Sequence, residues 1–511
     1  GMKDQGSLEC GQTRTPQVLT EESIPATMLL NFDVLFDVML HVSSRRDASW
    51  LMQTCRTLYS VGAPTMLSFP VELRSKRHFI SFHAFMSVGG GRRYQYLRKL
   101  TLGNGICGLT EEQMQQLIGL IHHATVIESL TIGHTSLLEE DLHFGYAIAQ
   151  LTNVKEFFMD TVNKSKTPTS WELLLHIRSN VVSARLDLLL ELDGIRQTRG
   201  DPIYLLQNLA DSLEILDVRN ADFATANIKY PHLKHLSVGL WHVAPIAPLI
   251  RAYPNLRTLV IHNLSFDLAE AIRRANREFQ LQRTWEALDY VETTINAAYN
   301  LAISCKIHFL NVEEVDTPED VTMLGSVLAD CRPSILSLSW DLLLEVKQFP
   351  CLAKNIPREL EHLVLRMDLS THSPDKMGET LDIVWKSLKT SKISKLEISL
   401  NWSDWAIDSG APMYSLWRGG EKPTPLKQYV QGLNVKTLAR RIISTIRSVQ
   451  YLCLRISYEG QDQESGGYWR TNRQGCCLAI DRLDEAVGKK VMFKKDRHFY
   501  MSRQYQSLMH C

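Results

Sequence analysis

One short pattern, apolar-x-x-apolar-x-apolar, recurs along most of this 511-residue chain. Two weaker copies begin at Ser183 and Trp285, and clear copies begin at residues 97, 127, 154, 213, 233, 256, 307, 335, 360, 393 and 449. Apart from the last step, successive copies start 20–33 residues apart. A fixed local signature at this spacing predicts a repeat architecture, in which each repeat contacts only its neighbours.

The residues between two copies are enough for a loop and one amphipathic helix. After the copy at 97–102, a loop at 103–109 leads to Thr110, which with Gln113 can form a capping box at a helix start. A short strand followed by a helix is the unit of leucine-rich repeats. We therefore predict an α/β fold, a leucine-rich-repeat solenoid whose parallel strands line the concave side of a horseshoe-like arc.

Composition divides the chain into four segments. We predict a disordered N-terminal segment, a small helical domain, the solenoid with two insertions (near 266–283 and 401–433), and a C-terminal cap, at residues 1–26, 27–68, 69–467 and 468–511 respectively. The first insertion carries a basic run, whereas the second is rich in tryptophan.

Charge and cysteine usage narrow the classes of function. Lys plus Arg equals Asp plus Glu, at 56 each, so the chain has no net field that would attract nucleic acid or an anionic membrane.

The ten cysteines form no C-x-x-C pair, which favours reduced thiols and a cytoplasmic or nuclear location. No apolar run reaches the length of a membrane span. The histidine pairs lack a nearby cysteine or carboxylate cluster, so no metal site is expected.

One glycine motif could belong either to a dinucleotide-binding site or to an ordinary strand-to-helix loop. Residues 103–108 read Gly-Asn-Gly-Ile-Cys-Gly, between a predicted strand and a predicted helix. A dinucleotide would place its pyrophosphate at that helix N-terminus, where Glu111 and Glu112 would repel it. We therefore interpret residues 103–109 as a strand-to-helix loop and expect no cofactor and no catalytic residue.

The segment before the repeats has more apolar residues than a unit of its size can bury. Its first helix carries most of them, with Asn31 as a possible cap. After a loop at 41–46, Asp47 can cap a second helix, and Gly62 with Pro64 begins a short third turn. A unit of about 40 residues rarely buries enough surface to stand alone. A partner or the solenoid is expected to cover part of this apolar surface.

This helical segment, Leu29–Leu67, resembles an F-box. Leu30 and Asp33 stand where that motif has its Leu and Glu, and Thr54-Cys55-Arg56 matches its second-helix signature. Asn31 replaces the usual Pro, and Ala48 replaces the usual apolar residue after the acidic step at Asp47. With the repeats, the chain resembles the F-box/leucine-rich-repeat proteins that are numerous in higher fungi.

The resemblance implies a substrate receptor of a cullin-based, SCF-type ubiquitin ligase. The F-box would dock on a Skp-type adaptor, the repeats would hold an unknown protein substrate, and the chain itself would catalyse nothing. The implied adaptor-binding residues are Leu30, Phe32, Val34, Leu35, Val38, Leu51, Cys55, Leu58 and Tyr59. The alternative is an interaction scaffold with a degenerate F-box and no ligase role.

The substrate surface is predicted from strand periodicity. Alternate strand residues point away from the helices, and in the C-terminal repeats these positions are polar or aromatic. The insertion at 401–433 adds tryptophans, which either recognise a partner or fold back on the repeats. The predicted substrate contacts are His362, Arg366, Lys395, Glu397, Tyr451, Arg455, Trp402, Trp405 and Trp417. The basic residues of the C-terminal cap are expected to form a solvated face. The alternative is that they bind an acidic partner.

Overall fold

A computed structural model of the chain divides it into two compact units, Gly1–Phe69 and Pro70–Cys511. The structure describes residues 32–160, 169–192, 196–225, 227–239, 245–262, 270–315, 317–341, 348–369, 374–402, 429–430, 432–458, 465–474 and 477–492. The predicted disordered segment and most of the insertion at 401–433 lie outside these residues.

The described part of the first unit, residues 32–69, contains four short helices where the sequence predicted three. They are α1 (Phe32–Leu40), α2 (Arg45–Thr54), α3 (Arg56–Val61) and α4 (Ala63–Ser68). The single second helix of the prediction is interrupted at Cys55, whose backbone is extended and whose thiol accepts a hydrogen bond from the Leu58 amide at 3.4 Å. The cap was also misplaced. Ser44, not Asp47, caps α2, accepting the Asp47 amide at 3.2 Å.

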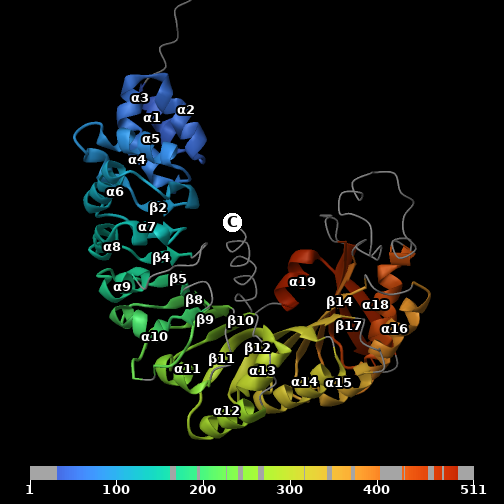
Figure 1. The fold of residues 1–511 in the computed structure, drawn as a ribbon. Helices are drawn as coiled ribbons and strands as arrows, with labels where there is room; N and C mark the ends of the chain where they lie inside the picture. The colour runs from blue at the N-terminus through green and yellow to red at the C-terminus, as the bar shows by residue number, and fades with distance from the viewer. Residues whose placement is uncertain are drawn as a thin grey trace, which may run out of the picture. The chain divides into compact units, whose positions relative to one another are not determined.

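The second unit contains one 16-stranded sheet, with helices along one of its faces (Figure 1). Neighbouring strands pair in parallel from β1 to β16, and β17 and β18 then continue the sheet antiparallel. The strands, in sheet order, are β1 (Val71–Leu73), β2 (Lys99–Leu102), β3 (Ser129–Ile132), β4 (Glu156–Met159), β5 (Ser183–Asp187), β8 (Ile215–Arg219), β9 (His235–Gly239), β10 (Thr258–His262), β11 (Ala287–Thr294), β12 (Lys306–Val315), β13 (Ile335–Asp341), β14 (His362–Asp368), β15 (Lys395–Trp402), β16 (Tyr451–Tyr458), β17 (Ser465–Gln474) and β18 (Cys477–Leu483). A separate hairpin, β6 (Leu189–Leu192) with β7 (Arg196–Arg199), is inserted between β5 and β8.

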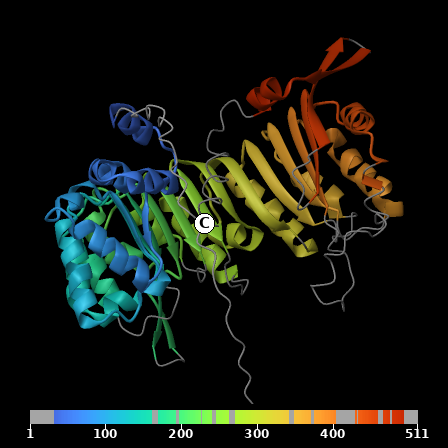
Figure 2. The ribbon, with the colours of Figure 1, turned by 90° about the horizontal axis from the view of Figure 1, so that it is seen from above.

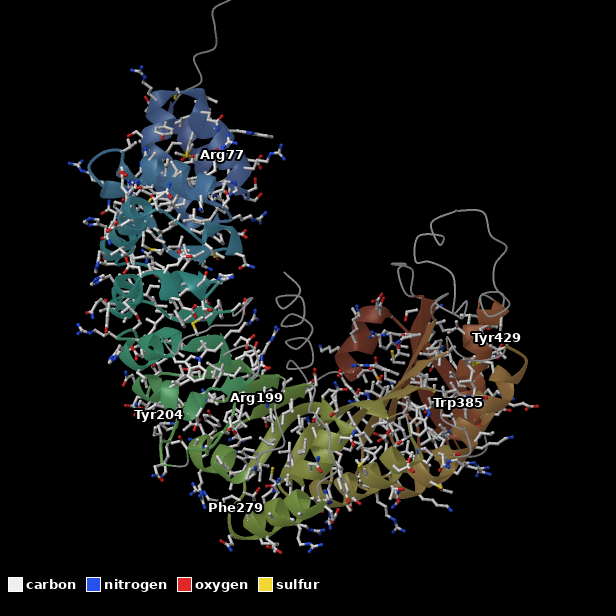
Figure 3. All side chains as sticks on the ribbon, viewed as in Figure 1. Arg77, Arg199, Tyr204, Phe279, Trp385 and Tyr429 are labelled. Atoms are coloured by element: carbon white, nitrogen blue, oxygen red, sulfur yellow. The ribbon has the colours of Figure 1, made fainter. Side chains whose placement is uncertain are left out.

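The connections between strands supply the helices, which differ in length. Figure 2 shows the same strands from above, and Figure 3 labels Phe279 on α12 and Trp385 on α16 within the helical layer. The helices are α5 (Lys76–Ser87), α6 (Glu111–His123), α7 (Ser136–Glu140), α8 (Leu142–Ala149), α9 (Thr169–His176), α10 (Pro202–Leu205), α11 (Ala247–Ala252), α12 (Glu270–Gln282), α13 (Ile295–Leu301), α14 (Pro318–Cys331), α15 (Phe349–Asn355), α16 (Pro374–Ser387), α18 (Val435–Thr445) and α19 (Glu485–Met492). The capping box predicted for Thr110 and Gln113 is confirmed at the start of α6.

The core lies between the sheet and these helices. One ladder of apolar side chains crosses the parallel strands in register, and every member is nearly inaccessible to solvent. Full burial of one such side chain contributes about 1.5–3 kcal/mol, so the ladder is a main source of stability. Its members include Leu100, Leu130, Phe157, Leu216, Leu236, Leu259, Val291, Leu310, Leu336, Leu363, Leu396 and Leu452.

All thirteen predicted copies fall on strands of this sheet, but three were placed in the wrong frame. Strand pairing aligns Ala184 with Leu216, Val291 with Leu310 and Leu336 with Leu363. The copies therefore begin at Val181, Leu288 and Pro333, and not at Ser183, Trp285 and Ile335. In β11 and β13 the misplaced frame included an apolar strand-face residue, Tyr290 or Ile335. In β5 the strand face is polar, and the frame was shifted because Leu186 and Leu188 were read as its second and third apolar positions.

The sequence also missed the first strand. Val71 and Leu73 of β1 pair with Leu100 and Leu102 of β2, and both are buried. Only three residues long, β1 lacks a recognisable apolar residue at the first position of the pattern, which is occupied by Ser68.

Candidate functional site

The face of the sheet opposite the helices, which we call the strand face, carries most of the predicted substrate contacts. Val291 and Leu310 line a small space together with Val327 of α14, which places α14 on their side of the sheet. Alternation along each strand then puts Tyr290, Phe309 and their neighbours on the strand face. On the C-terminal strands the corresponding residues are His362, Arg366, Lys395, Glu397, Tyr451 and Arg455.

Two of these residues, Glu397 and Arg455, form a polar cluster with Tyr468 on β15, β16 and β17. The Arg455 guanidinium lies 3.9 Å from the Glu397 carboxylate and donates a hydrogen bond to the Tyr468 hydroxyl at 2.9 Å. Glu397 is only 4% exposed. Burial is the largest single influence on the pKa of Arg455 and lowers it, but Glu397, Cys453 and Tyr468 together outweigh burial and raise that pKa above its usual value. These contacts hold the three groups in fixed positions, whereas the sequence neighbour Lys395 contacts α19 instead.

Helix α19 packs over this end of the strand face. Met492 contacts Cys453 and Tyr468, and the Lys395 amino group donates a hydrogen bond to the Val491 carbonyl oxygen at 2.8 Å. Burial raises the pKa of Tyr468 to about 12, with a smaller contribution from Cys453. The structure therefore brings Lys395, Glu397 and Arg455 together as predicted neighbours, but places them beside a helix that the sequence did not reveal.

His362 and the tryptophans have different environments. His362 is 3% exposed on β14, in register between Ile335 and Lys395. Trp402 ends β15, and its side chain lies outside the described residues, as do Trp405 and Trp417. The proposed role of the insertion at 401–433 thus remains a prediction.

A second polar cluster, on β4, β5 and β8, was not identified as a site from the sequence. The Arg185 guanidinium donates to the Asp217 carboxylate at 3.1 Å and lies 5.5 Å from the centre of the Phe158 ring. Burial raises the pKa of Asp160, and the positive charges of Arg185 and Arg219 oppose that rise. The strand frame at Val181 would have placed Arg185 beside Asp217, but the misplaced frame hid the pair.

The first unit has an apolar surface of its own. Its helices expose Val34, Phe36, Val38, Leu40, Trp50, Tyr59 and Val61, each by more than a third. Among the predicted adaptor contacts, Val34, Val38 and Tyr59 are exposed, Leu35, Leu51 and Cys55 are partly buried, and Leu58 is buried. Leu30 and the side chain of Phe32 lie outside the described residues.

The exposed residues of α1 lie on two sides of the helix. Val34 and Val38 are four residues apart, as are Phe36 and Leu40, while Met39 between them is fully buried. A helix that is apolar around most of its circumference is normally covered on more than one side. Several large apolar side chains exposed on one short helix are typical of a protein interaction site.

The glycine motif at residues 103–108 makes its contacts within the protein. The Gly103 amide donates to the Leu73 carbonyl at 2.9 Å, and a Cβ on Gly105 would overlap the Arg74 carbonyl oxygen. The Gly108 amide is taken by the Glu140 carboxylate at 2.9 Å. The glycines permit close approach to the backbone of the preceding repeat, so their spacing has a structural explanation.

Within the described ranges, no group of three or more His, Cys, Asp or Glu side chains is arranged to hold a metal ion. In the same part of the chain, no helix combines the length and the apolar character needed to cross a membrane. No family model matches the sequence, and neither does any curated protein.

Proposed function

We propose that the chain is a substrate-binding subunit of an SCF-type ubiquitin ligase. The first unit would dock on a Skp-type adaptor, and the second, a leucine-rich-repeat solenoid, would hold the substrate protein. The observation that carries the proposal is the apolar surface of α1, α2 and α3. Seven large apolar side chains are exposed there within 28 residues, Val34 to Val61.

This surface suits a protein partner for energetic reasons. Interfaces are anchored by a few buried aromatic and aliphatic side chains surrounded by polar residues. Trp50 is 55% exposed and stacks under the Arg46 guanidinium, 4.6 Å from the ring centre. An exposed tryptophan beside an arginine has the composition of an interface anchor. The resemblance of this segment to an F-box names the partner class.

The second unit supports the same proposal through its one-sided architecture. Parallel strands with helices on one face leave the other face for ligands. The strand face presents side chains of both signs, such as Arg185, Asp217 and Arg455. A surface of mixed charge fits a folded protein or a peptide better than a polyanion. In this function the chain catalyses nothing and acts by raising the local concentration of the substrate near the conjugating enzyme.

A pull-down from source cells tests the proposal. The full chain should co-purify with a Skp-type adaptor and a cullin, identified by mass spectrometry. Val38→Glu should abolish recovery, because it places a charge in the apolar surface, whereas Asp37→Ala, an exposed change on the same helix, should not. A chain lacking residues 27–68 should retain substrate without adaptor.

The scaffold alternative makes the opposite prediction for the adaptor. If other proteins co-purify with the chain while adaptor and cullin are absent from both wild type and Asp37→Ala, the F-box-like unit has no ligase role. In that case the second unit would still bind its partner through the strand face.

A further inference from the structure

A cluster of apolar side chains lies on the strand face in the middle of the sheet. This strand-face cluster consists of Tyr290, Phe309 and Ile335, with Val260 packed against it. The Tyr290 and Phe309 rings meet edge to face, with their centres 5.2 Å apart. All three main members are 7% exposed or less, although the adjacent helix α14 packs against the opposite face of the sheet. Such a cluster is stable only if something covers it.

Polar groups around the cluster indicate the chemistry of that cover. Glu292 on β11 is 4% exposed and accepts a hydrogen bond from the Tyr290 hydroxyl. The Ser337 hydroxyl is fully buried and has no hydrogen-bond partner among the described residues. The described strand-face positions of β11, β12 and β13 include the buried Glu292 but no Lys, Arg or His. An apolar segment with positive charge fits this environment, because positive charge nearby stabilises a buried carboxylate.

Helix α19, the last helix of the described residues, packs on the strand face. Met492, the last residue of α19, packs on Cys453 and Tyr468, while Lys395 holds the Val491 carbonyl. Lys395 belongs to a row of residues in register on successive strands, namely Tyr290, Phe309, Ile335, His362 and Lys395. Strands lie about 4.8 Å apart, so the cluster begins roughly 10 Å from Lys395. The end of α19 therefore lies close to the cluster.

The sequence after α19 has the required chemistry and length. Residues 493–511 comprise four Lys or Arg residues against one Asp, with aromatic or large apolar side chains at Phe493, Phe499, Tyr500, Met501, Tyr505, Leu508 and Met509. Nineteen residues span about 28 Å as a helix and more when extended, which exceeds the roughly 20 Å from Lys395 to Tyr290. This basic, aromatic segment is therefore long enough to reach the cluster, and it has the apolar side chains and the positive charge that the cluster requires.

We propose that residues 493–511 bind the strand-face cluster of their own chain, with α19 as the anchor. The segment then occupies the surface that a ligand of the strand face would use, and a ligand must displace it. That last, regulatory consequence rests on the proposed substrate-binding function, whereas the intramolecular contact does not. Competition of this kind multiplies the association constant for the ligand by the fraction of chains in which the face is free.

A peptide-binding experiment tests the contact directly. A fluorescent peptide of residues 493–511 is titrated into a chain ending at Met492, and into the full chain, at low ionic strength. We expect binding in the micromolar range to the shortened chain and at least tenfold weaker binding to the full chain, because its own segment competes. Half-molar salt should weaken the interaction by screening its charges. No binding to the shortened chain, or equal binding to both chains, overturns the proposal.

Matched variants locate the binding site. Val260→Lys introduces a positive charge beside the cluster at a position that is only partly buried, and should weaken peptide binding at least tenfold. Thr131→Lys makes the same change on β3, at a partly buried strand-face position far along the sheet, and should leave binding unchanged. Equal effects of the two substitutions mean that the peptide binds by charge alone, and this contradicts the assignment.

Photo-cross-linking in the full chain tests the same contact without removing any residues. Benzoylphenylalanine is placed at position 499 and photolysed in dilute solution. Cross-links to residues of β10–β13 within the same chain support the proposal. Cross-links only between two chains, or only to other segments, overturn it. None of these assays contains an adaptor, so a failure of the ligase proposal would leave their outcome unaffected.

Discussion

The Lys395 amino group donates a hydrogen bond to the Val491 carbonyl oxygen, and the two atoms lie 2.8 Å apart. This contact connects β15 to the last turn of α19. Through this contact and the packing of Met492, a C-terminal helix closes over the end of the strand face. Gly488 makes the close approach possible, because a Cβ there would overlap the ring of Tyr468.

Replacement of Gly488 by Ala should therefore displace α19. Overpacking of this kind costs about 1–3 kcal/mol, which we expect to weaken the packing of α19 on Tyr468. We expect faster proteolysis after Leu483 and faster hydrogen exchange in β16, both measured by mass spectrometry. Val487→Ala, which alters a half-exposed side chain on the same helix, should change neither. Unaltered proteolysis of Gly488→Ala would show that α19 is not held by this contact.

Gly105 and Gly119 should respond oppositely to alanine. Gly105→Ala brings a Cβ onto the Arg74 carbonyl oxygen and should destabilise the second unit by at least about 1–3 kcal/mol. Gly119 lies in α6 with open space around its Cβ position, so Gly119→Ala should stabilise the fold by about 0.5–1 kcal/mol. Urea unfolding of both variants measures the difference. A neutral Gly105→Ala would contradict the structural explanation of the glycine motif.

The ion pair between Arg273 and Asp330 should contribute far more than a surface pair. The two groups lie 2.5 Å apart, and both side chains are less than 10% exposed. Removing one partner leaves an uncompensated buried charge, so Asp330→Ala should cost about 3–5 kcal/mol. Glu128→Ala breaks the exposed pair with Arg98 and should cost less than about 1 kcal/mol. Similar midpoints in urea for both variants would count against the placement of α12.

Buried thiols predict a loss of stability in alkaline solution. Burial raises the pKa of Cys453 to about 12 and that of Cys305 to about 11, from an ordinary value of 9.0. Both thiols favour the neutral form in the folded state. Their contribution to stability is therefore present below pH 9 and is lost as the pH rises from 9 toward 12. At pH 8 a thiol reagent should label the exposed Cys351 well before Cys305 or Cys453. Equal labelling rates by mass spectrometry would contradict the burial of these strands.

Much of the sheet could be predicted from the sequence, because apolar periodicity is a direct signal of buried strand positions. Leu216, Leu236, Leu259 and Leu363 occupy the second apolar position of their copies of the pattern, and all four are at most 1% exposed. In β11 and β13 the frame failed because these strands carry apolar residues on both faces. Tyr290 was assigned to the core ladder, but its ring packs on the strand face against Phe309. Only pairing between strands resolves this ambiguity, and pairing is not visible in one sequence.

The candidate sites were less predictable, because they depend on contacts distant in sequence. The Arg185–Asp217 pair joins residues 32 positions apart, and the contact of Lys395 with Val491 spans 96 positions. Neither can be derived from local spacing. In the first unit, the high apolar content indicated an interaction surface. It did not show which side chains lie inside, so Leu58 was grouped with the exposed Val38 and Tyr59.

Direct binding between the purified full chain and the Skp-type adaptor of its source organism tests the central claim. In a calorimetric titration we expect a dissociation constant in the micromolar range or lower, and Trp50→Ala should weaken it at least about tenfold, or by about 1.4 kcal/mol. Gln53→Ala, an exposed change on the same helix, should leave the constant unchanged. Absence of binding at about 100 μM of folded chain, or equal affinities for wild type and Trp50→Ala, would contradict the proposed ligase function.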